Sequence, residues 1–218
     1  MTSEAIGAKT TVTIPRSANT DLVVAQSAGN DAPQLTIGLP EEARISADAS
    51  AAGKAAVSYS GQDTQTIVQP FEDGLRLSTI LRSGSSPTRY TYMLPAEVTP
   101  RLNEDGSAIL ASTFGGVNSD GESMGITYGA VGAPWAVDSA GASVRTHYEA
   151  SEGALIQVVE PTRSTVFPVV ADPTFWWGWN AFISNSVHQQ VLDLMKIGAA
   201  AVSIATLFVS YIPNPMYS

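Results

Sequence analysis

Short segments of alternating apolar and polar residues, separated by turn residues at close spacing, constrain the fold of this chain more than any other feature. A period of two is the pattern of a strand with one buried face. Such segments occur at residues 66–71, 75–82, 89–94, 143–148, 154–159 and 165–170. Asp-Gly pairs at 73–74, 105–106 and 120–121 favour the positive φ angles of hairpin turns. The pattern predicts an all-β fold, an antiparallel sandwich or barrel of about ten short strands.

Composition narrows the classes of function. The chain has 218 residues, no cysteine and a net charge of −9. This length can bury the core of one domain with appendages. Without cysteine the chain cannot form disulfides, cysteine-ligated zinc sites or a cysteine nucleophile. The negative charge repels a phosphate backbone, so we expect no nucleic-acid partner.

Composition also divides the chain into three regions. Residues 1–34 are rich in Ala, Ser, Thr and Asn and are expected to be a flexible leader or propiece, with a loose strand at 11–14 as the alternative. Residues 35–173 are the predicted β-sandwich domain, in which the small side chains of 45–56 predict a short exposed helix or a linker. Residues 174–218 are a predicted Trp-rich linker followed by an apolar and amphipathic α-helix.

The first residues do not resemble a secretory signal. Residues 1–10 contain Glu4 and no apolar run of the length that such a signal needs. We therefore expect any export to depend on a signal outside this sequence or on a different route.

The C-terminal region contains a predicted helix. Ser186 and Gln189 have the spacing of a capping box, and apolar residues then recur at helical spacing. Residues 197–212 are uncharged and would span roughly 24 Å as a helix, against roughly 30 Å for the hydrocarbon core of a bilayer. The residues expected to contact a membrane or a partner helix are Trp176, Trp177, Trp179, Val187, Val191, Leu194, Met195, Gly198, Val202, Leu207 and Phe208.

Three environments are open to this helix, and pairing with another helix is the least favoured of them. It can pack on the β domain, insert into or adsorb on a lipid bilayer, or pair with a helix of a membrane protein or of a second copy of the chain. The tryptophans suit an interfacial anchor at the membrane surface. All three environments use the same apolar residues, so they stay open at this point.

One motif suggests a hydrolase. Residues 121–125 (GESMG) match the GxSxG nucleophile elbow, with Ser123 as the nucleophile, and Asp138 and His147 follow in the order of a triad. The elbow requires an apolar strand before it and a helix after it, whereas polar residues precede this motif and a strand-like segment follows. We interpret 121–125 as a hairpin loop and keep a serine hydrolase as the least favoured alternative.

The sequence predicts neither a metal site nor a cofactor. Its two histidines, His147 and His188, are too few for a histidine-based metal site, and we expect both to be polar surface residues. The acidic pairs lie beside turns, where carboxylates commonly occur.

Three segments resemble a family signature. Residues 133–141 (APWAVDSAG), 155–159 (LIQVV) and 167–173 (FPVVADP) are similar to exported actinobacterial proteins of unknown function, in which an all-β domain ends in a YPVVADP signature before a short, apolar, bacteriocin-like tail. A similar ending precedes the repeats of wall-associated and rearrangement-hotspot-type surface proteins. The resemblance covers about residues 57–173. It implies a location outside the cytoplasm or at the cell surface, and a structural or carrier role.

These observations predict a non-enzymatic exported protein whose β domain carries a membrane-active or membrane-anchoring helix, released by cleavage near Asp172 and Pro173. The alternative is an extracellular or cell-wall-associated binding module, with a cell-wall component as its partner and the tail helix packed on the fold. In both, Asp172 and Pro173 are expected to end the sheet, because proline cannot donate to a strand ladder. Trp135 is expected to be a core aromatic residue.

Overall fold

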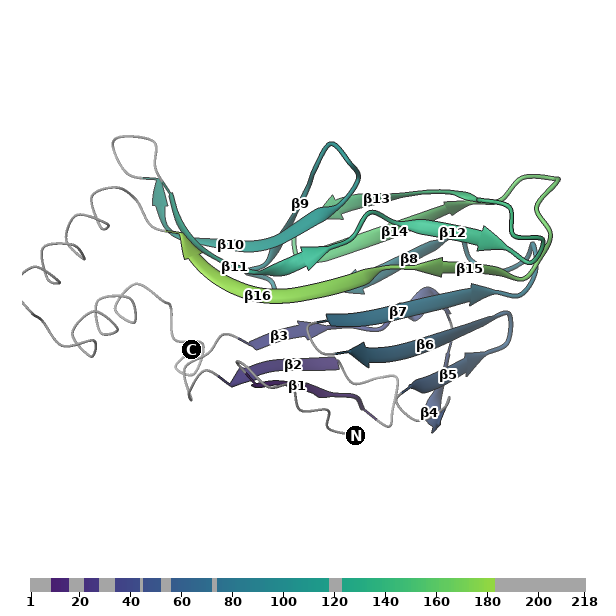
Figure 1. The fold of residues 1–218 in the computed structure, drawn as a ribbon, viewed down its shortest axis with the longest axis horizontal. Coiled ribbons are helices and arrows are strands. Elements are labelled where there is room, and N and C mark those ends of the chain that lie inside the picture. The colour runs from purple at the N-terminus through teal and green to yellow at the C-terminus, as the bar shows by residue number, and fades with distance from the viewer. Residues whose placement is uncertain are drawn as a thin grey trace, which may run out of the picture.

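The computed structural model describes residues 9–15, 22–27, 34–43, 45–51, 56–71, 74–117 and 123–182, and these are mostly β-strand (Figure 1). The prediction of an all-β, antiparallel fold is confirmed, and the sheets do not close into a barrel. The described elements are β1 (Lys9–Thr13), β2 (Leu22–Ser27), β3 (Gln34–Ile37), the 3₁₀ helix η1 (Glu41–Ala43), β4 (Ile45–Ala51), β5 (Val57–Gly61), β6 (Thr64–Phe71), β7 (Gly74–Leu81), β8 (Arg89–Met93), β9 (Thr99–Leu102), β10 (Ala108–Val117), β11 (Ser123–Val131), β12 (Trp135–Asp138), β13 (Arg145–Ser151), β14 (Ala154–Glu160), β15 (Val169–Asp172) and β16 (Thr174–Phe182).

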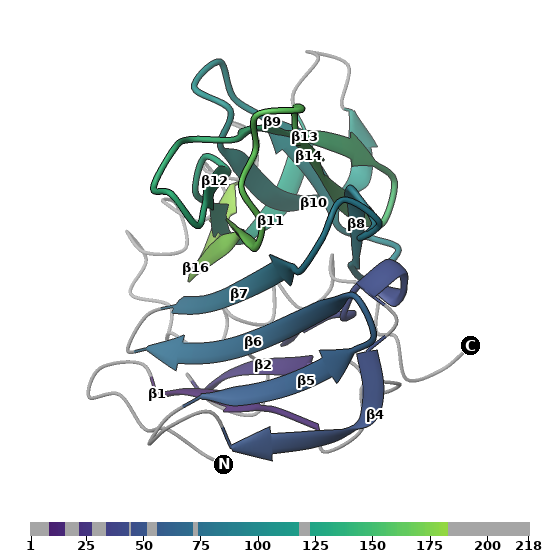
Figure 2. The ribbon, with the colours of Figure 1, turned by 90° about the vertical axis from the view of Figure 1, so that its right-hand side faces the viewer.

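Ten strands form one open sheet. Its order is β4-β5-β6-β7-β16-β11-β10-β9, with β15 pairing with β7 and β12 pairing with β15. Figure 2 shows β4, β5, β6 and β7 following one another along one side of the molecule. β6 and β7 form the predicted hairpin, in which Phe71 lies opposite Gly74. Glycine is required here, because the Phe71 ring occupies the place of a side chain at position 74 and the Phe175 carbonyl oxygen would lie 2.6 Å from its Cβ.

Four segments near the N-terminus are strands. β1 pairs with β2, and β2 with β3, in a separate three-stranded sheet. The strand alternative predicted at 11–14 is therefore found at residues 9–13, and the prediction of a flexible leader is wrong for residues 9–13 and 22–27. β4 pairs with β5 at the edge of the ten-stranded sheet, so the prediction of a helix or linker at 45–56 is wrong for residues 45–51. An extended segment satisfies its backbone hydrogen bonds on a neighbouring strand, and small side chains do not prevent this.

The core cluster contains buried side chains from all three sheets: the ten-stranded sheet, the β1-β2-β3 sheet and a third sheet of order β13-β14-β8. On β7, Leu75, Leu77 and Leu81 point inward and are fully buried. Tyr92 of β8 meets Phe175 of β16 edge-on, with ring centroids 6.1 Å apart. Because alternate residues of each strand point to opposite faces, this inward set also fixes which side chains of β7, β15 and β16 point outward.

The chain re-enters the sheet after Asp172 and Pro173, so the prediction that the sheet ends there is wrong. β15 and β16 both pair with β7, and the register of β15 continues into β16 across the Asp-Pro step. Pro173 has no N–H, but its carbonyl oxygen accepts the Leu77 N–H at 3.1 Å, which preserves the ladder. The Trp-rich segment predicted as a linker is therefore the start of β16, which lies between β7 and β11.

The predicted C-terminal helix lies outside the described residues. This applies to the capping box and to the expected contact residues from Val187 to Phe208. Their helical structure and their contacts stay predictions.

Candidate functional site

The two segments that carry most of the family resemblance are partners in the structure. Residues 133–141 contain β12 and residues 167–173 contain β15, and the two strands pair antiparallel. Trp135 lies opposite Asp172, and Asp138 lies opposite Val169. The signature therefore describes one two-stranded ladder with an aspartate at each end.

Asp138 holds the turn at one end of this ladder. Its Oδ1 accepts the N–H groups of Ala140 at 3.0 Å and Ala142 at 2.9 Å, and its Oδ2 accepts the N–H of Val166 at 3.0 Å. These bonds, led by those from Val166 and Ala142, favour the ionised carboxylate and hold the pKa of Asp138 below its usual value. Asp138 thus joins two loops that are distant in the sequence.

The same loop contacts explain why β15 starts later than predicted. The Ser139 hydroxyl donates to the carbonyl oxygens of Val166 at 2.9 Å and Phe167 at 3.1 Å. Backbone groups of 166 and 167 therefore bond to this turn rather than to a neighbouring strand. As a result the strand predicted at 165–170 begins only at Val169.

The described residues do not show the hydrolase triad. Ser123 starts β11, so a strand follows it where a nucleophile elbow requires a helix. The carboxylate of Asp138 is occupied by backbone N–H groups. His147 lies half-exposed on β13, with Nδ1 3.2 Å from Glu160 Oε1 and Nε2 3.7 Å from Glu149 Oε1. The imidazole therefore faces carboxylates other than Asp138.

Asp172, at the other end of the ladder, is a buried carboxylate. Its side chain is paired through Oδ2 with Arg76 Nε at 3.2 Å and accepts the Thr174 hydroxyl at 3.0 Å. Its Oδ1 is buried and has no hydrogen-bond partner within the described part of the chain. Burial raises the pKa of Asp172, and the Thr174 hydroxyl, Arg76 and the Trp135 side chain oppose this rise.

The expected cleavage boundary lies inside the sheet. Asp172 is 1% exposed and Pro173 is buried, and the backbone on both sides pairs with β7. A protease can reach this peptide bond only after the sheet opens locally. The fold therefore disfavours processing at this position in the native state.

Two tryptophans are half-exposed on the outer side of the ten-stranded sheet. Trp135 lies opposite Asp172, and Trp176 follows Asp172 by four residues in the same register, so the three side chains share a face. Trp135 is 42% and Trp176 45% exposed. The Trp176 ring meets Phe71 edge-on at a centroid distance of 5.0 Å. We call Trp135, Trp176 and the half-exposed Arg76 between them the tryptophan face.

The prediction of Trp135 as a core residue is wrong. Ala136, its neighbour on β12, is the inward residue, and Trp135 points outward, opposite Asp172. The three tryptophans that were expected to contact a membrane, Trp176, Trp177 and Trp179, all belong to β16. Trp177 lies opposite Gly129 of β11. The side chains of Trp177 and Trp179 lie outside the description, so Trp176 is the one whose exposure the structure shows.

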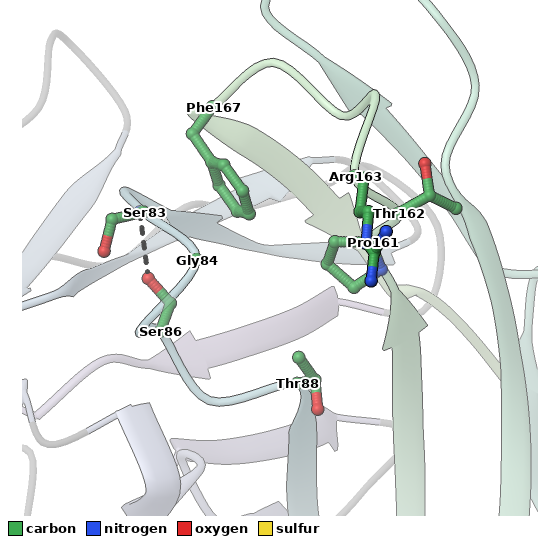
Figure 3. Close-up of a pocket in the computed structure, with 8 residues that line it drawn as sticks. All are labelled: Ser83, Gly84, Ser86, Thr88, Pro161, Thr162, Arg163 and Phe167. Carbon is green, nitrogen blue, oxygen red and sulfur yellow. Dashed lines mark hydrogen bonds between the residues drawn. The ribbon is translucent and has the colours of Figure 1, made fainter.

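A pocket of about 290 Å³ lies where the β7–β8 loop approaches the β14–β15 loop (Figure 3). Figure 3 shows the Phe167 ring pointing into the space between the two loops. Sequence reasoning missed this pocket because its walls come from loops far apart in the chain, and neither loop contains a recognisable motif. The lining residues are Ser83, Gly84, Ser86, Thr88, Pro161, Thr162, Arg163 and Phe167.

No protein-family model matches this chain, and the searches of curated proteins and of solved structures also find no match. Among the described residues, no group of three or more His, Asp or Glu side chains could hold a metal ion. Within the same residues, no helix is long and apolar enough to cross a membrane.

Proposed function

We propose that this protein is a non-enzymatic, exported binding module with a sandwich-like β domain, which its C-terminal apolar helix tethers to a membrane. The observation that supports a tether is the position of β16, the strand that leads into residues 183–218. β16 pairs with β7 on one side and with β11 on the other. A segment that follows such a strand stays attached to the fold, so it suits an anchor better than a peptide released by cleavage at Asp172.

Export is supported by the resemblance of residues 57–173 to exported and wall-associated proteins. A binding role is supported by the tryptophan face, because half-exposed tryptophans beside charged groups are enriched at interaction surfaces. These features agree with display of the β domain outside the cell.

Flotation with lipid vesicles tests the tether. The full chain is mixed with vesicles of zwitterionic and anionic lipids and centrifuged through a density gradient. We expect the chain to float with the vesicles, because the predicted helix buries apolar surface in the bilayer. The double variant Leu194→Asp with Val202→Asp places two charges on the apolar face and is expected to reduce the floating fraction at least tenfold.

The matched control places the same charge on the polar face. Gln189→Asp with Gln190→Asp adds two negative charges and is expected to float like the unchanged chain. The tether is wrong if the unchanged chain stays in the dense fractions, or if both double variants lose flotation equally.

A second candidate is a binding module whose tail helix packs on the β domain, which the exposed tryptophan face favours as an apolar surface available to a helix. Limited proteolysis separates the two. A packed tail resists cleavage between residues 183 and 218 in water, and vesicles do not change the pattern. A tethering tail is cleaved in water and protected when vesicles are present.

A further inference from the structure

We propose that the pocket between the β7–β8 and β14–β15 loops binds a carboxylated sugar unit. The proposal deepens the proposed function, because a displayed binding module needs a ligand, and it names the site and the chemical class of that ligand. The pocket volume of about 290 Å³ lies just below the ~300–1,000 Å³ typical of small-molecule sites. It therefore suits a single ring rather than a long chain.

The first wall is fixed by hydrogen bonds before any ligand arrives. The Ser83 N–H donates to the Ser86 hydroxyl at 3.1 Å, and the Ser86 N–H donates to the Ser83 carbonyl at 3.1 Å. The Ser86 hydroxyl in turn donates to the carbonyl oxygen of Asp63 at 2.7 Å, which ties the loop to the start of β6. A loop held in this way loses little entropy on binding.

The second wall is fixed independently. The Thr162 N–H donates to the Thr165 hydroxyl at 2.8 Å, and the Thr165 N–H donates to the Thr162 carbonyl at 3.1 Å. The Ser139 hydroxyl donates a hydrogen bond to the Phe167 carbonyl oxygen at 3.1 Å, so the backbone of Phe167 is also held in place. Both walls are thus positioned by groups that do not themselves need the ligand.

Charge selects an anion. Arg163 is the only charged side chain among the lining residues, and it is exposed. Within the described part of the chain it has no ion pair, although the whole chain has a net charge of −9. A guanidinium binds a carboxylate through two parallel N–H···O bonds. One guanidinium balances one negative charge, which favours a carboxylate over a doubly charged phosphate.

The remaining lining selects a sugar ring. Thr88 supplies a hydroxyl group that can both donate to and accept from ring hydroxyls, whereas the hydroxyls of Ser83 and Thr162 bond to Ser85 and Ser164 at 2.8 Å within their own loops. Phe167 supplies an aromatic surface whose negative face attracts the C–H groups of a ring. The Thr88 hydroxyl, one aromatic ring and one guanidinium together match the groups of a uronic-acid-type sugar.

Titration of the full chain with D-glucuronate tests this site. Calorimetry or ¹H–¹⁵N chemical shifts are expected to give a dissociation constant on the order of 1 mM, as expected for a ligand of this size. D-glucose lacks the carboxylate and is expected to bind at least tenfold more weakly. Arg163→Gln is expected to weaken glucuronate binding at least tenfold, whereas Arg82→Gln, an exposed arginine on the same loop as Ser83 but outside the lining, is expected to change it less than twofold.

A second pair of variants tests the place rather than the charge. A Cβ at Gly84 would lie 3.7 Å from Phe167 Cε2, an ordinary contact, so the fold tolerates a side chain there. Gly84→Val fills space beside the ring and is expected to reduce glucuronate binding at least fivefold. Ser85→Thr changes the neighbouring exposed residue, which does not line the pocket, keeps the hydroxyl that bonds to Ser83 at 2.8 Å, and is expected to leave binding unchanged.

Three results would overturn the proposal: no binding of glucuronate at 20-fold the expected dissociation constant, equal binding of glucose, or equal losses for Arg163→Gln and Arg82→Gln. The titration is carried out without lipid, so it does not depend on the tether. If the chain binds glucuronate but does not float with vesicles, the tether fails and the sugar site stands. If it floats but does not bind, the sugar site fails and the tether stands.

Discussion

The two ends of the β12–β15 ladder hold aspartates in opposite electrostatic conditions. Asp138 accepts three backbone N–H groups, and its pKa lies below the usual value. Asp172 is buried, has one oxygen without a described partner, and its pKa lies above the usual value. Only a few residues separate the two along the same pair of strands. Backbone donors aimed at a carboxylate stabilise its charge, and burial with too few donors does the reverse.

The two aspartates of the signature differ in how fully their oxygens are hydrogen-bonded. Asp138 closes a turn, and both of its carboxylate oxygens accept hydrogen bonds from backbone N–H groups of the fold. Asp172 lies beneath the exposed side chains of Trp135 and Arg76 with an oxygen that lacks a partner, which is costly for stability. Buried groups of this second kind occur more often at functional surfaces. The Asp138 end therefore maintains the ladder, and the Asp172 end belongs to the tryptophan face.

The largest effect is expected for Asp138→Ala. The change leaves the N–H groups of Ala140, Ala142 and Val166 without their acceptor, and we expect the melting temperature to fall by about 6–10 °C. The matched control is Asp105→Ala, because the exposed Asp105 accepts the N–H of Ser107 at 2.9 Å in a simple turn. Thermal unfolding followed by circular dichroism is expected to show a shift of about 2 °C or less for the control. Equal shifts would contradict the structural role of Asp138.

Arg76→Ala is expected to have the next largest effect. It leaves Asp172 buried without its ion-pair partner, a change that costs about 3–5 kcal/mol for a fully buried pair. Arg76 is itself 46% exposed, so solvent screening reduces the expected loss to about 1–2 kcal/mol in urea unfolding. Arg89→Ala is the control, since Arg89 pairs with an exposed carboxylate, Glu149, through bonds of 3.0 and 2.6 Å. A loss for Arg89→Ala as large as that for Arg76→Ala would remove the distinction.

The pH dependence of stability sharpens the comparison further. A raised pKa in the folded state means that ionisation of Asp172 opposes folding, so its cost is absent below its ordinary value of 3.8 and grows as the pH rises through the folded pKa. Asp172→Asn is therefore expected to gain a few °C in melting temperature relative to the unchanged chain between about pH 4 and pH 7.

Asp138→Asn is expected to show the opposite trend. Its depressed pKa contributes stability that is present above 3.8 and is lost as the pH falls through the folded pKa. The gap between the unchanged chain and this variant should therefore narrow in acid. Parallel pH profiles for the two variants would show that the environments of the aspartates do not differ as described.

Local pattern predicted much of this fold. The alternation of residues 66–71 and 75–82 around Asp73-Gly74 gave the β6–β7 hairpin, and the segments at 89–94 and 154–159 correspond to β8 and β14. Predictions from the local pattern failed where pairing with a strand distant in the sequence determines the secondary structure. The small residues of β4 follow the edge of β5, and the proline at 173 is accommodated because its carbonyl oxygen still pairs with Leu77. A proline by itself does not show whether pairing with the sheet ends at that residue or resumes after it.

The candidate sites were less predictable than the strands. Trp135 follows a proline in a short strand, and either face was open to it until its pairing with Asp172 was known. The pocket depends on Arg163 and Phe167 meeting the Ser83 loop, a juxtaposition that no spacing in the sequence encodes. The elements were predicted from periodicity, which is local, and the sites arise from topology, which is not.

The smallest expected effect isolates the contribution of the Trp135 N–H group to Asp172. Trp135→Phe keeps an aromatic ring but removes the donor that lowers the pKa of Asp172, so this pKa should rise further. We expect a loss of about 0.5–1 kcal/mol near pH 7, where Asp172 is ionised, and a smaller loss near pH 4. Trp176→Phe is the matched control, because the Trp176 ring packs edge-on against Phe71 and no hydrogen bond to Asp172 is involved. Its loss should be the same at both pH values, so two pH-independent losses of equal size would exclude the Trp135 N–H group from the environment of Asp172.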